Sequence, residues 1–104
     1  MNNLVIVDLE SEHTKSIKAV YYQHDFGVKV RLVNTHDLPL LIEFANVGDS
    51  KIKHDEQYSG DDVEIPEDIL VDGRDVWIFV SVSEPDFIKT LKEVIVRVIR
   101  RPSR

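Results

Sequence analysis

Hydrophobic residues along the chain fall into short runs, and a polar turn separates the runs about every ten residues. Residues 4–7 form a compact run of branched apolar side chains, whereas Val28, Val30 and Leu32 alternate with charged residues. Successive side chains of a strand point to opposite faces, so such alternation predicts a strand with one buried face and one wet face. The pattern predicts strands at residues 4–7, 19–22, 28–32, 40–44, 63–65, 76–82 and 94–99.

The strongest of these patterns lies at residues 76–82, where apolar side chains occur on both faces. One face carries four branched residues and the other carries Trp77 and Phe79, followed by Ser81. Two apolar faces are typical of a central strand that is partly covered on both sides. We therefore expect Trp77 to belong to the core, and to count as an interface anchor only if its face is exposed.

Two segments between the strands have a different character. Residues 51–60 are polar, with Ile52 and Tyr58 as their apolar anchors, and we expect this stretch to be the least ordered. Residues 66–70 predict one helical turn, because Pro66 suits a first helical position and acidic residues suit a first turn. Gly73 can take the left-handed conformation that ends such a turn.

The segment at residues 87–98 fits two patterns. A helical stripe is formed by Phe87, Leu91, Val94, Ile95 and Val98. Residues 94–99 are rich in branched side chains and favour a strand instead. We keep the strand for residues 94–99 and leave residues 87–93 open between helix and strand.

The length of 104 residues predicts one domain over 1–104, with residues 98–104 as a basic C-terminal tail. The spacing of strands and turns predicts an all-β fold. We expect an immunoglobulin-like antiparallel β-sandwich of about seven strands with one short helical turn.

The composition argues against several kinds of partner, chemistry and cellular location. The net charge is -6, with a pI near 5.1, which argues against a nucleic acid that binds the whole surface. There is no cysteine, so disulfides and thiolate chemistry are excluded. The N-terminal apolar run is too short for a signal peptide or a membrane span, so we expect neither export by a standard signal nor a helical anchor.

Candidate chemistry is weak throughout the chain. Three His-Asp dipeptides occur at residues 24–25, 36–37 and 54–55, and His13 stands alone. An aspartate can orient an imidazole, but neighbours on a strand point apart, and the histidines lack the close spacing of a metal site. No glycine-rich phosphate loop and no serine-nucleophile motif is present. We predict no catalytic residue, no metal site and no cofactor, and therefore not an enzyme.

Charge is distributed unevenly along the chain. Residues 55–75 are strongly acidic, whereas the C-terminus carries a group of basic residues, namely Arg97, Arg100, Arg101 and Arg104. Opposite charges at two ends favour association between copies, or docking onto an acidic partner. The four arginines are our candidate partner-binding residues.

Residues 65–102 contain an ordered set of features. Ile65-Pro66 is followed by Ile69-Leu70, then by a glycine and the aromatic strand at 72–80, and the segment ends in Arg100-Arg101-Pro102. This order resembles the immunoglobulin-like N-terminal modules of tailed-phage virion proteins, of the upper-baseplate and head-fibre type. In those proteins the module leads into a fibre or receptor-binding part, whereas this sequence stops two residues after Pro102. The resemblance implies attachment or capsid decoration rather than host recognition.

Two functions remain open at this point. The first is a non-catalytic virion structural or accessory protein of a tailed bacteriophage, made in the host cytoplasm and present in many copies or as a homo-oligomer. It would bind capsid, tail or baseplate subunits, without contact to nucleic acid or membrane. The alternative is an acidic cytoplasmic inhibitor, such as a DNA mimic that binds a host enzyme, which the net charge permits.

Overall fold

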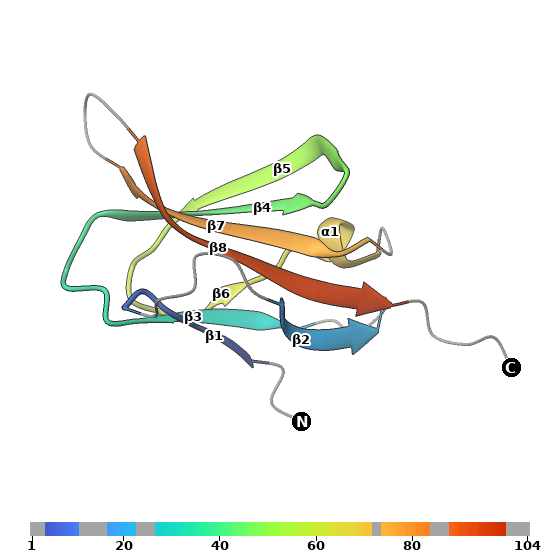
Figure 1. Ribbon diagram of the computed structural model, residues 1–104, viewed down its shortest axis with the longest axis horizontal. Helices are drawn as coiled ribbons and strands as arrows, with labels where there is room; N and C mark the ends of the chain where they lie inside the picture. The colour runs from blue at the N-terminus through green and yellow to red at the C-terminus, as the bar shows by residue number, and fades with distance from the viewer. Residues whose placement is uncertain (1–3, 11–16, 23–26, 72–73, 84–87, 100–104) are drawn as a thin grey trace, which may run out of the picture.

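Two β-sheets, of three and five described strands, face each other across the apolar core (Figure 1). The computed structural model describes residues 4–10, 17–22, 27–71, 74–83 and 88–99. Within these ranges the three-stranded sheet has the order β1-β3-β6, with β1 (Leu4–Asp8), β3 (Lys29–Val33) and β6 (Val63–Glu64). The five-stranded sheet has the order β2-β8-β7-β4-β5, with β2 (Ile17–Tyr22), β8 (Ile88–Ile99), β7 (Val76–Ser83), β4 (Leu40–Asn46) and β5 (Asp49–Gln57).

The predicted two-sheet β fold with one short helical turn is confirmed, and the described strands number eight, close to the seven expected. The prediction of purely antiparallel pairing is wrong. β1 runs parallel to β3, and β2 runs parallel to β8. The β1–β3 pair meets the requirement of parallel pairing for a crossover, because the chain leaves β1, forms β2 in the other sheet, and then returns to form β3 beside β1. In the β2–β8 pair, the strands β3 to β7 lie between the two partners along the chain.

The core lies between the two sheets and follows directly from the alternation seen in the sequence. Alternate residues of each strand face the other sheet and are almost fully buried, as Val30 in β3, Phe44 in β4 and Ile78 in β7 show. Burying a side chain of this size contributes roughly 1.5–3 kcal/mol relative to its exposure. The inward faces therefore fix which side of each strand meets the opposite sheet.

The helix α1 (Glu67–Val71) fills space beside the core. It starts after Pro66, whose carbonyl accepts the Leu70 N–H at 3.3 Å, as the sequence predicts. Ile69 and Leu70 are fully buried, so the helix contributes apolar side chains where the five-stranded sheet is wider than its partner. Gly73 lies outside the described residues. None of the described helical residues forms a helix long and apolar enough to cross a membrane.

The expectation that residues 51–60 are the least ordered is wrong for most of that stretch. β5 is a nine-residue strand that pairs antiparallel with β4, from Asn46 opposite Asp49 to Leu41 opposite Gln57. β5 is an edge strand, so one row of backbone hydrogen bonds to β4 holds it in place. Because that pairing needs no apolar stripe, the hydrophobic pattern did not reveal the strand.

The strand at 94–99 is confirmed, and it extends back to Ile88, so the helical alternative is wrong for residues 88–98. Phe87 lies outside the described residues. A register shift at Val80/Ser81 leaves Leu91 as an extra residue, because Val80 pairs with Lys92 and Ser81 with Thr90. Such a bulge brings Leu91 and Val94 onto the core at a spacing of three, which imitates a helical stripe.

Candidate interaction surface

Trp77 and Phe79 lie on the side of the five-stranded sheet that faces away from the core. Both rings are partly exposed, and they stack with centroids 4.9 Å apart at an interplanar angle of 27°. The expectation that Trp77 belongs to the core is wrong, since the buried cluster contains its neighbours Val76 and Ile78 but not Trp77. The physical reason is that the three-stranded sheet covers one face of β7, and no other described strand or helix is layered on the opposite face (Figure 1).

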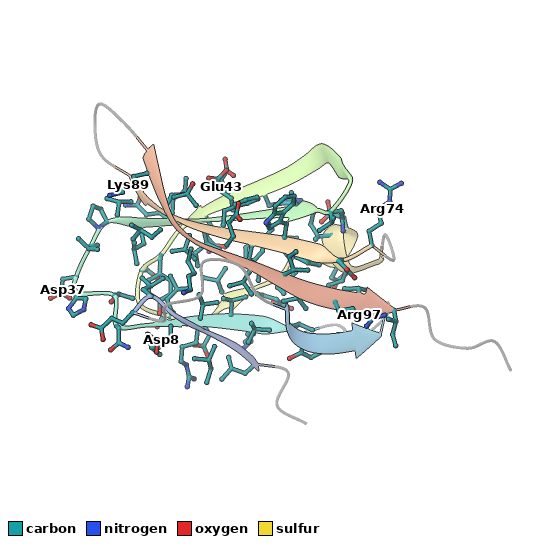
Figure 2. All side chains as sticks on the ribbon, in the orientation of Figure 1. Asp8, Asp37, Glu43, Arg74, Lys89 and Arg97 are labelled. Atoms are coloured by element: carbon teal, nitrogen blue, oxygen red, sulfur yellow. The ribbon has the colours of Figure 1, made fainter. Side chains whose placement is uncertain are left out.

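The strand register defines the surface around these two rings, which we call the outer face. Its described members are Leu41, Glu43 and Ala45 of β4, Asp55 and Gln57 of β5, Trp77, Phe79 and Ser81 of β7, and Thr90, Glu93, Ile95 and Arg97 of β8. Ala45 and Ser81 are buried between their larger neighbours. Figure 2 shows Glu43 on the side of β4 that faces away from β1 and β3. The outer face therefore combines aromatic, aliphatic and charged side chains.

These residues form rows across the strands. Phe79 lies between Glu43 and Glu93, and Asp55 continues this acidic row onto β5. In the next row Trp77 lies between Ala45 and Ile95. Both rows are fixed by backbone pairing at the centre of the sheet, so the outer face is a preformed surface.

Arg97 is the one predicted partner-binding residue that the structure places on this surface. It is exposed and lies two residues beyond Ile95 along β8, next to β2 (Figure 2). Neither Arg97 nor Glu93 forms an ion pair with another of the described residues. Arg100, Arg101 and Arg104 lie outside the described residues, so their role stays a prediction.

The sequence reasoning placed Trp77 in the core and kept its role as an interface anchor only for the case of an exposed face, so the outer face was not among the candidate sites. The alternation at residues 76–82 showed a second apolar face on β7, and this was interpreted as coverage by further structure. The same pattern also fits an open sheet face that carries aromatic residues. Pattern alone does not separate the two, because both place apolar side chains at alternate positions.

The described histidines bind carboxylates far away in the sequence, not the aspartates beside them. The His36 Nε2 hydrogen-bonds Glu10 Oε1 at 2.5 Å, and His54 Nε2 of β5 hydrogen-bonds Asp68 Oδ2 of α1 at 2.9 Å. Among the described residues no group of three or more histidine or acidic side chains is placed to hold a metal ion. His13 and His24 lie outside the described residues.

The acidic segment at residues 55–75 is divided among several surfaces. Asp55 belongs to the outer face, whereas Asp62 forms a two-pronged ion pair with Arg31 of β3, at 2.8 and 3.0 Å. This hydrogen bonding lowers the pKa of Asp62 below its ordinary range, and it raises the pKa of the Arg31 guanidinium. The described carboxylates therefore do not gather on one continuous face.

Comparison with known proteins does not assign this chain to a family. The chain matches no protein-family model and no curated protein. The resemblance of residues 65–102 to tailed-phage modules stays a prediction from the sequence.

Proposed function

We propose that this chain is a non-catalytic structural or accessory protein of a tailed-phage virion that binds other virion subunits through the outer face. One observation carries the proposal: Trp77 and Phe79 lie stacked and partly exposed at the centre of a preformed sheet face. Aromatic side chains are enriched at protein interfaces, where they provide large contact area at a low cost in conformational entropy. A central aromatic pair with charged residues around it is the usual arrangement of an interface core and its rim.

The opposite side of the molecule supports the choice of this face. On the three-stranded sheet the outward positions of β3 are Lys29, Arg31 and Val33, and Arg31 already pairs with Asp62. Ile6 of β1 is half-exposed there, and it lies opposite Arg31 in the register. The two outer surfaces of the sandwich thus differ in their described aromatic residues, and the face with the stacked aromatic pair is the better protein-binding surface.

The order of the strands supports an immunoglobulin-like plan as the finer description of the fold, and we propose it on that basis. The orders β1-β3-β6 and β8-β7-β4 correspond to strands A-B-E and G-F-C of that plan. The parallel pair β1–β3 departs from its antiparallel sheets. This likeness agrees with the phage modules that residues 65–102 resemble, which is why a virion is the proposed setting.

Co-sedimentation with phage particles tests the function. The particles come from a phage whose genome carries this chain beside its capsid or tail genes. We expect the wild-type chain to band with particles in a density gradient, and the Trp77→Ala variant to stay at the top. The matched control is Ile6→Ser, which removes an exposed apolar side chain from the other sheet and is expected to band like the wild type.

Two results would overturn the proposal. One is the absence of the wild-type chain from purified particles, together with capture of a host DNA-processing enzyme by a strictly monomeric chain, which would favour the acidic-inhibitor alternative. The other is equal banding of the Trp77→Ala variant and the wild type. Circular dichroism of each variant shows that loss of binding is not loss of folding.

A further inference from the structure

We infer that the outer face of one copy packs against the outer face of a second copy, about a twofold axis that runs across the strands at the Trp77–Ile95 row. This inference names a partner for the surface on which the proposed function rests. It comes from the order of charges along β8. Glu93, Ile95 and Arg97 point outward in succession, so an acid and a base lie on either side of an apolar residue.

A twofold axis across the strands brings these charges together. Each residue of a strand rises about 3.3 Å, so Glu93 and Arg97 lie roughly 7 Å on either side of Ile95. The axis lays β8 of one copy antiparallel over β8 of the other, with Ile95 opposite Ile95. Glu93 of each copy then faces Arg97 of the other, and the two ion pairs are equivalent by symmetry.

The other twofold arrangement is disfavoured by charge. An axis that runs along β7 would lay the acidic row of one copy over the acidic row of the other. Glu43 would then face Glu93, and the carboxylates would repel each other. Like charges placed opposite each other suppress a binding mode, so the row pattern selects the arrangement across the strands.

The size of the face is sufficient for such a pair. Five strands spaced by about 4.8 Å span about 19 Å, and the eight residues of β7 span about 26 Å. Each copy therefore offers a projected area of about 500 Å², and its accessible surface is larger because side chains stand out from the sheet. Two copies reach the roughly 1,000 Å² that a specific interface needs.

Charge reversal tests the arrangement by sedimentation velocity over a range of concentrations. R97E makes the chain acidic at both positions, and E93R makes it basic at both. We expect each variant alone to self-associate roughly tenfold more weakly than the wild type, because like charges then face each other. An equimolar mixture of the two variants is expected to recover wild-type association, since both facing pairs become complementary. The matched controls K29E and E64R reverse a cross-strand pair on the three-stranded sheet and are expected to associate like the wild type.

Three outcomes would overturn the inference. They are a wild-type chain that stays monomeric up to about 1 mM, a mixture that associates no better than its components, and controls that weaken association as much as the test variants. None of these outcomes affects the co-sedimentation experiment with phage particles. If the wild type is monomeric and the Trp77→Ala variant does not band with particles, the outer face binds a different virion subunit and the proposed function stands. If the wild type is monomeric and the Trp77→Ala variant does band with particles, both the inference and the proposed function fail.

Discussion

Asn46 lies buried at the end of β4, where its side-chain Nδ2 donates a hydrogen bond to the Ile69 carbonyl of α1 at 2.8 Å. A second, longer contact of 3.5 Å reaches the Arg74 carbonyl. These bonds connect β4 to the helix and to the segment that leads into β7. A buried carbonyl that loses its donor pays the cost of desolvation without compensation.

Replacing Asn46 by alanine should therefore destabilise the protein by about 1–3 kcal/mol in chemical denaturation. Ser81→Ala is the matched control, because the Ser81 Oγ is buried and has no hydrogen-bond partner among the described residues. We expect that control to unfold within about 0.5 kcal/mol of the wild type, or to be more stable. Equal losses in the two variants would show that the Asn46 bonds do not hold α1 in place.

The ion pair between Arg31 and Asp62 predicts a pH-dependent contribution to stability. The pKa of Asp62 is lowered by the hydrogen bonds from Arg31, so the folded state favours the ionised carboxylate. The stabilisation is present above the unfolded carboxyl pKa, about 3.9, and is lost as the pH falls through the lower folded pKa. Asp62→Asn should then melt below the wild type at pH 7, and the difference should shrink to zero in acid.

Thermal melts of wild type and variant between pH 7 and pH 2 measure this difference. Asp61→Asn removes the neighbouring exposed charge, which has no ion pair with another described residue, and should show no such pH dependence. A gap between Asp62→Asn and the wild type that stays constant down to pH 2 would contradict the assignment.

At the scale of the elements, the hydrophobic pattern predicted the strands that bury one face. β3 shows why, because Val30 and Leu32 are buried while Lys29 and Arg31 are exposed, as period-two alternation requires. β5 escaped prediction since its place at the sheet edge depends on the backbone of β4, which the residues of β5 do not encode. The start of β8 was ambiguous because its bulge breaks the alternation.

The candidate site was predictable only in part for a related reason. Charge marked Arg97 from the sequence, and the structure places it on the outer face. The row that joins Trp77 to Ala45 and Ile95 depends on pairing between three strands far apart in the sequence. The alternation of apolar and polar residues within one strand does not show which other strands will pair with that strand.

β5 lies at the edge of its sheet and β7 lies in the interior, so the two strands should differ in their rates of amide hydrogen exchange. β7 is paired on both sides, by β4 and β8, whereas β5 is paired on one side only among the described strands. We expect the amides of β5 to exchange at a lower opening free energy than those of β7, because an edge strand opens without disturbing the core. Native-state hydrogen exchange measures this, and equal protection of the two strands would show that β5 unfolds only with the whole domain.

For the whole molecule, the central consequence of the fold is an asymmetry between its two outer surfaces. The five-stranded sheet presents a stacked aromatic pair, with Phe79 in the acidic row and Trp77 in the apolar row beside it, whereas the described outward residues of the three-stranded sheet are charged or aliphatic and none is aromatic. A sandwich with aromatic side chains on one of its two outer surfaces has one face on which large aromatic rings can be removed from water in a fixed orientation. Both proposals above depend on this one surface.

The most direct test of this surface uses Trp77, which is the sole tryptophan of the chain. Labelling with 5-fluorotryptophan gives one fluorine resonance that reports on this side chain alone, even inside a larger assembly. We predict that a soluble paramagnetic agent broadens the resonance in the dilute chain, and that this broadening is lost when the chain is concentrated or bound to particles. A resonance that is equally accessible to the agent in the isolated and the assembled chain would contradict the claim that the outer face is the binding surface.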